Sequence, residues 1–141
     1  MDTFGIDEAA ATFQVTVERL AEPELNVALD RLNQSFNIDL SKLFPWETPG
    51  EKRGVRRGDG WSLIDEFVGD QSCLLHGGGT RIVRAFESGK DLGLVLANTP
   101  GFETYVFDAE VAYLICHNHH DALIGWGAAS VWVQNLPENL S

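Results

Sequence analysis

The stretch Phe102–Trp126, FETYVFDAEVAYLICHNHHDALIGW, decides the fold of this chain. It is rich in the β-branched and aromatic residues that favour strands. In residues 102–107 and again in 111–117, apolar side chains occupy both alternating faces, which is typical of strands covered on both sides. The turn-forming residues around Asn118 and His119 let residues 121–126 return antiparallel. We therefore predict that this stretch is the centre of an antiparallel sheet.

Two earlier segments are expected to extend this sheet. Residues 72–75 and 80–85 have the composition of short strands, and the run Gly77-Gly78-Gly79 between them is typical of a hairpin turn. The predicted fold class is therefore α+β, with an antiparallel sheet built from the segments near 73–85 and 103–126.

Helices are expected on both sides of these strands in the sequence. Apolar residues at helical spacing predict helices 7–20 and 23–36, which would form an N-terminal helical hairpin packed on the sheet. Short helices are predicted at 61–68, at 89–98 after the capping sequence Ser88-Gly-Lys-Asp91, and at 128–136. The run Val131–Val133 is equally compatible with an edge strand.

Length and composition limit the possible functions. The 141 residues predict a single domain, 1–141, with a flexible basic loop near 47–60 that contains Lys52, Arg53, Arg56 and Arg57. The formal net charge of −11 argues against nucleic acid and anionic membranes as partners, because both would repel the protein. Two cysteines are too few for a disulfide scaffold, and neither a signal peptide nor a spanning apolar run is visible. A cytoplasmic location is the expectation.

Three histidines and a carboxylate lie together in His117-Asn-His119-His120-Asp121. Imidazole and carboxylate groups are ligands for zinc and other transition metals, so His117, His119, His120 and Asp121 are the candidate metal ligands of an alternative hypothesis, a metal-binding protein or metal-dependent hydrolase. The same residues could instead contact a partner, or they could simply form a turn in which Asn118 supports the backbone. The sequence leaves the three interpretations open.

Other candidate reaction motifs are incomplete. His76-Gly77-Gly78-Gly79 would need a Gly-x-Ser-x-Gly segment to serve an esterase, and the chain has none. Ser88–Asp91 lacks the upstream glycine of a phosphate-binding loop and the hydroxyl residue that follows the lysine there. Cys116 and His117 are adjacent on a strand and therefore point to opposite faces. We predict no catalytic residues and no cofactor, so the chain is not expected to be an enzyme. The basic loop with Trp61 nearby could bind an anionic ligand.

The segments GFETYVFD (101–108) and AYLICHNHHDALI (112–124), with their flanking acidic residues, resemble the small acidic α+β immunity proteins that bacteria encode beside secreted antibacterial toxins. The resemblance implies a non-catalytic inhibitor that binds one cognate toxin, a basic protein partner, and neutralises it by occlusion. It carries over no contact residues. The candidate partner-binding residues follow from charge and expected exposure, since carboxylates orient a basic partner and exposed aromatics anchor it. They are Glu103, Asp108, Glu110, His119, His120, Asp121 and Trp126, with Trp132 as a further aromatic candidate.

Overall fold

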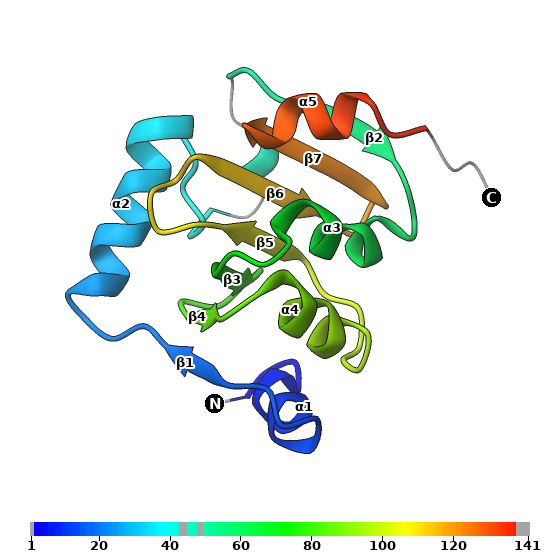
Figure 1. The fold of residues 1–141 in the computed structure, drawn as a ribbon. Helices are drawn as coiled ribbons and strands as arrows, with labels where there is room; N and C mark the ends of the chain where they lie inside the picture. Colours follow the sequence, from blue (N-terminus) through cyan, green and yellow to red (C-terminus); the bar gives the residue numbers. More distant parts are fainter. Residues whose placement is uncertain (1, 43–44, 48–49, 138–141) are drawn as a thin grey trace.

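The computed structural model describes residues 2–42, 45–47 and 50–137, and these residues contain a seven-stranded antiparallel sheet (Figure 1). The strand order is β1-β4-β3-β5-β6-β7-β2. In chain order the strands are β1 (Val17–Arg19), β2 (Arg53–Arg56), β3 (Cys73–Gly77), β4 (Val83–Phe86), β5 (Thr104–Phe107), β6 (Tyr113–His117) and β7 (Ala122–Gly127). The predicted α+β class and the central antiparallel strands are confirmed.

Helices cover both faces of the sheet. The α-helices are α1 (Ile6–Thr12), α2 (Glu24–Phe36), α3 (Ile64–Val68), α4 (Gly89–Leu96) and α5 (Ala129–Gln134), with 3-10 turns η1 (Pro45–Glu47) and η2 (Gly60–Leu63). One face carries α1, α3, α4 and α5, and the other carries α2 and the segment after it (Figure 1). Every residue of β3, β5 and β6 is consequently buried, as the two apolar faces predicted.

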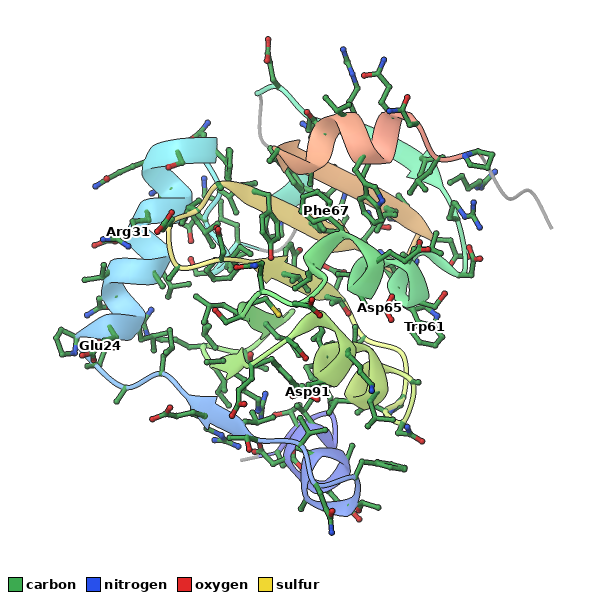
Figure 2. All side chains as sticks on the ribbon, viewed as in Figure 1. Glu24, Arg31, Trp61, Asp65, Phe67 and Asp91 are labelled. Atoms are coloured by element: carbon green, nitrogen blue, oxygen red, sulfur yellow. The ribbon has the colours of Figure 1, made fainter. Side chains whose placement is uncertain are left out.

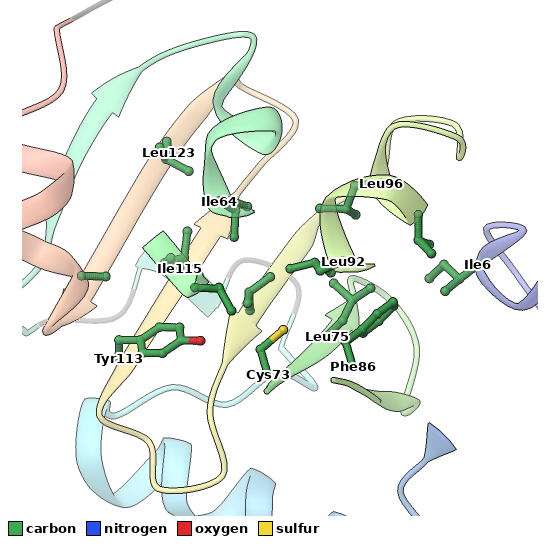
Figure 3. Packing of buried hydrophobic residues seen from close by; sticks show 14 of the residues in the cluster. Ile6, Ile64, Cys73, Leu75, Phe86, Leu92, Leu96, Tyr113, Ile115 and Leu123 are labelled. Carbon is green, nitrogen blue, oxygen red and sulfur yellow. The ribbon is translucent and has the colours of Figure 1, made fainter. Parts of the chain in front are cut away.

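Each face has its own hydrophobic core. Under α1, α3 and α4 the side chains of Ile6, Ile64 and Leu92 meet the strand residues Leu75 and Ile115 (Figure 3). Under α2, a second cluster surrounds Leu32, Tyr105, Phe107 and Trp126. Alternate residues of one strand therefore serve opposite cores, which explains the continuous apolar runs in the sequence.

The predicted N-terminal helical hairpin is wrong. Helix 7–20 ends at Thr12, Gln14 adopts a positive φ of 59°, and Val17–Arg19 forms strand β1, which pairs with β4. The β-branched residues in 12–17 favour this strand over a helix. Because β1 separates them, α1 and α2 lie on opposite faces of the sheet. The predicted helix 23–36 is confirmed as α2.

The basic segment differs from its prediction as well. Arg53–Arg56, expected within a flexible loop, form strand β2, which pairs with β7 along the sheet edge. Both edge strands are short, and Glu18 and Arg19 of β1, like Arg53 and Arg56 of β2, are exposed charges, which discourages another strand from adding there. Residues 48–49 of the predicted loop lie outside the described residues. The helices predicted at 61–68, 89–98 and 128–136 are confirmed as η2 with α3, α4 and α5, so Val131–Val133 is helical.

Candidate functional site

Three segments that are distant in sequence meet at one end of the central strands. The register pairs Thr104 with His117, so the start of β5 lies beside the turn that joins β6 to β7. The backbone N–H of Arg57 donates to the carbonyl of Asp121 at 2.8 Å, which ties the segment after β2 to the same turn. Residues 57–61, 97–103 and 118–121 therefore surround one opening.

These segments enclose a pocket of about 390 Å³, which we call the hairpin pocket. It combines carboxylate, imidazole and aromatic side chains with small apolar ones, and no Lys or Arg is among the residues that line it. The lining residues are Gly58, Trp61, Leu96, Ala97, Thr99, Pro100, Gly101, Phe102, Glu103, Thr104, His117, Asn118, His119 and Asp121.

The β6–β7 turn is held by Asn118. Its side-chain oxygen accepts hydrogen bonds from the backbone N–H groups of His120 (2.9 Å) and Ala122 (3.2 Å). Asp121 takes a left-handed conformation with φ 59°, which Asp tolerates better than most residues. The turn interpretation of the histidine cluster thus describes its backbone correctly. The arrangement leaves His119, His120 and Asp121 on the surface.

Glu103 is the best-anchored acidic group of the pocket. Its Oε1 accepts a hydrogen bond from the Tyr105 hydroxyl at 2.9 Å, and its Oε2 lies 2.7 Å from Nδ1 of His119. Burial raises the pKa of Tyr105, and the adjacent Cys116 and Glu103 add to the rise, so the hydroxyl stays protonated as a donor. The Glu103 side chain is 18% exposed, whereas that of His119 is 52% exposed. Two hydrogen bonds therefore fix the orientation of a carboxylate that is mostly buried.

Glycines let the surrounding segments approach closely. A Cβ on Gly77 would lie 2.5 Å from the Phe4 ring, which stacks on Phe102 with centroids 4.6 Å apart. A Cβ on Gly78 would lie 2.8 Å from Cβ of Glu103. The glycine run that begins at the last residue of β3, predicted as a simple hairpin turn, thus also makes room for Phe102 and Glu103.

The four candidate metal ligands lie near one another but do not converge on a common point. His117 is buried and its Nε2 donates to the carbonyl of Arg57 at 3.0 Å, near η2. The rings of His119 and His120 instead contact Trp46, on the α2 side. Across the part of the chain that the structure describes, no group of three or more His, Cys, Asp or Glu side chains could hold a metal ion. The geometry gives the alternative metal hypothesis no support.

The predicted partner-binding residues fall into separate groups. Glu103, His119 and Asp121 line the hairpin pocket, and His120 is exposed beside them. Asp108 and Glu110 lie at the opposite end of β5 and β6, where Asp108 Oδ1 accepts from the Ala112 N–H at 2.8 Å and so stabilises the turn.

The expectation that Trp126 is an exposed aromatic is wrong, because its side chain is 1% exposed in the core beneath α2. A strand covered on both faces leaves no surface for it. Trp132 is half-buried against the Phe67 ring, with centroids 5.2 Å apart. Burial therefore rules out Trp126 as the aromatic anchor that the sequence suggested, whereas the partly exposed Trp132 stays a candidate.

The sequence did not identify Trp61 and Phe102 as members of one site. Trp61 lies at the start of η2 and projects toward the edge of the molecule (Figure 2). The sequence did contain one signal, the glycines that cluster near both residues, such as Gly58 and Gly60. In the structure Gly60 allows a close approach, because a Cβ there would lie 2.9 Å from the His117 ring. None of the arginines of the basic segment lines the pocket, and the side chain of Arg57 donates to both oxygens of Asp59 at 2.9 Å and to the carbonyl of Pro137.

Comparisons of the chain with known protein-family models, curated proteins and solved structures find no match. Among the described residues, no helix has both the length and the apolar character required to span a membrane.

Proposed function

We propose that this protein is a non-catalytic protein-binding module, and that the hairpin pocket and the turn 118–121 bind a basic surface of a partner protein. The finer proposal is a cytoplasmic immunity or inhibitor protein that neutralises a cognate toxin by occlusion. That part rests on the sequence resemblance and on the acidic composition.

The observation that carries the proposal is the chemistry of the pocket lining. Two carboxylates, Glu103 and Asp121, open onto the same cavity as the aromatic side chains of Trp61 and Phe102. Clusters that pair an aromatic anchor with charge are typical of protein-binding hot spots. The two thiols do not favour a nucleophilic function instead, because burial raises the pKa of Cys73 to about 12 and that of Cys116 above its usual range.

The charge distribution supports a basic partner. The sequence contains no Lys or Arg after Lys90, and most of the pocket lining comes from this part of the chain. Such a field speeds the encounter with a basic surface and orients it, and added salt screens the effect. We expect the association rate constant to fall steeply between 50 and 500 mM salt. A salt-independent rate would contradict the electrostatic part.

Capture from extracts of the native cell tests the location of the binding surface. The full chain serves as bait in three forms: the natural sequence, Glu103→Gln with Asp121→Asn, and Asp108→Asn with Glu110→Gln. Both double variants remove two negative charges, but only the first alters the pocket. A partner retained by the natural chain and by the 108/110 variant, and lost from the 103/121 variant, supports the proposal.

Two outcomes contradict it. Equal retention by all three baits would place the binding surface elsewhere. If none of the baits retains a protein at physiological salt, a stable protein partner is excluded for those cells.

A further inference from the structure

The hairpin pocket is lined by two carboxylates and two large aromatic side chains, a combination that suits some basic side chains better than others. We propose that it binds the guanidinium group of an arginine side chain that the partner inserts, with Glu103 as the acceptor and Trp61 and Phe102 as the walls. This inference rests on the proposed protein-binding function and names the side chain that the site recognises.

The acceptor geometry favours a two-pronged donor. A carboxylate has about four acceptor positions on its two oxygens. In Glu103 the Tyr105 hydroxyl occupies one position on Oε1, and the His119 ring occupies one on Oε2. Both oxygens therefore keep acceptor capacity, and the two existing bonds fix the plane of the group. A guanidinium donates two parallel N–H bonds to such a carboxylate, whereas an ammonium acts as a point charge.

The walls favour the same group. A planar, weakly hydrated guanidinium stacks on aromatic faces more readily than a strongly hydrated ammonium does. Trp61 and Phe102 both line the pocket, and the Phe4 ring, stacked against Phe102 with an interplanar angle of 9°, supports that wall from behind. Leu96, Ala97 and Pro100 supply apolar surface for the methylene stem of the side chain.

A second carboxylate strengthens the selection for a cation. Asp121 lines the pocket beside Gly58, where an added Cβ would lie 3.8 Å from the carboxyl carbon of Asp121. The missing side chain at position 58 thus leaves space in front of this carboxylate. Of the two histidines that line the pocket, His117 donates its Nε2 proton to the Arg57 carbonyl, and His119 lies against Glu103.

The test uses a small probe, so that it does not depend on finding the partner. The protein is titrated with Nα-acetyl-arginine methylamide at constant chloride concentration, and the indole N–H signals of the four tryptophans are followed by NMR. Two comparison probes are used. Nα-acetyl-citrulline methylamide has nearly the same shape as the arginine probe without the charge, and Nα-acetyl-lysine methylamide carries an ammonium group. The Trp61 signal is assigned with Trp61→Phe.

The expected result is a saturable shift of the Trp61 signal with a dissociation constant on the order of 1 mM. The signal of the buried Trp126 stays in place. Glu103→Gln weakens binding about fivefold or more, because a charge-assisted pair is lost, while Glu110→Gln leaves it unchanged. Citrulline gives no saturable shift, and lysine binds more weakly than arginine.

Equal binding of citrulline, equal binding of lysine, or no saturable arginine shift would each overturn the arginine assignment. These failures are distinguishable from failure of the proposed function. If capture of a partner depends on Glu103 and Asp121 while the arginine probe does not bind, the pocket recognises a different basic group. If the probe binds but capture is insensitive to the 103/121 variant, the pocket accepts arginine and the partner docks elsewhere.

Discussion

The replacement Asp7→Asn is expected to destabilise the fold by weakening the attachment of helix α1 to the sheet. Arg84 of β4 is 3% exposed, and its Nε donates to Asp7 Oδ1 at 2.9 Å while its terminal nitrogen donates to Oδ2 at 3.2 Å. Arg19 of the edge strand β1 pairs with the same carboxylate. One side chain of α1 therefore neutralises a buried guanidinium and also holds β1.

The magnitude follows from the environment of the two partners. Removing one partner of a fully buried pair costs about 3–5 kcal/mol, because the other charge is left unpaired. Here the Asp7 side chain is 37% exposed, and Asp2 Oδ1 remains 3.6 Å from Arg84, so we reduce the cost to about 1.5–2.5 kcal/mol. For 141 residues the unfolding entropy is about 0.3 kcal/mol/K, so the melting temperature should fall by about 5–8 °C.

Thermal and urea unfolding of Asp7→Asn and of Glu8→Gln measure this cost. Glu8 is exposed in the same first turn of α1, so its variant removes an equal charge and the same interaction with the helix dipole. We expect a loss below about 0.5 kcal/mol for the Glu8→Gln control. A loss in Asp7→Asn no larger than in the control would show that the pair with Arg84 does not stabilise the fold.

The same pair predicts a pH dependence with a definite sign. The hydrogen bond from Arg84 is the largest influence on the pKa of Asp7 and, with Arg19, lowers it despite partial burial. A carboxyl with a lowered folded-state pKa stabilises the fold above its unfolded-state pKa of about 3.9, and this contribution is lost as the pH falls through the folded-state value. The stability difference between the natural chain and Asp7→Asn should therefore be full at pH 7 and narrow below about pH 4. A difference that stays constant between pH 7 and pH 3 would contradict the ion-pair explanation.

Three further predictions concern packing, capping and thiols. In Gly125→Ala the new Cβ would lie 2.7 Å from a backbone oxygen of α5, so the free energy of unfolding should fall by about 1–3 kcal/mol. The control Gly101→Ala, whose Cβ would have nothing within 4 Å, should lose little stability. Equal urea midpoints for the two variants would contradict the close approach. The Ser88 side chain caps α4 by accepting a hydrogen bond from the Asp91 backbone N–H at 3.1 Å. Ser88→Ala should therefore lower the free energy of unfolding by about 1 kcal/mol, and an unchanged urea midpoint would contradict this role. The two buried thiols, Cys73 and Cys116, should resist iodoacetamide at pH 8 in the folded protein and react with it in urea. Mass spectrometry would detect the labelling, and rapid labelling of the folded chain would show that the thiols are not buried.

The central strands were predictable because their burial is continuous. In residues 104–107 and 113–117 both faces are apolar, and no helical period competes with the strand pattern. The cap of α4 was predictable for a similar local reason: Ser88 and the residue it caps are three positions apart. In both cases, residues close together in the sequence were enough to predict the local structure.

The edge strands were not predictable from local pattern. Val17–Arg19 and Arg53–Arg56 are three and four residues long and carry exposed charges, so their conformation is set by pairing with β4 and β7. The cap of α1 was hidden for a related reason. The carboxylate of Asp2 accepts the N–H groups of Asp7 and Glu8 from outside the usual capping position.

The candidate site was only partly predictable. Its acidic members Glu103 and Asp121 stood out by charge, but Trp61 and Phe102 join them only because of the β5–β6 register and the pairing of β2 with β7. Trp126 was chosen for its residue type, and the second layer of helix covers it. Sequence spacing indicates which faces are apolar, whereas the sheet order decides which loops meet.

Hydrogen–deuterium exchange on the complex with the captured partner shows directly whether the partner binds at the hairpin pocket. We expect slower exchange in residues 97–103 and 118–121 on binding, with no change in the turn at 108–112 or along α2. Protection confined to 108–112 or to α2, with unchanged exchange in both pocket loops, would contradict the claim that the partner binds at the hairpin pocket.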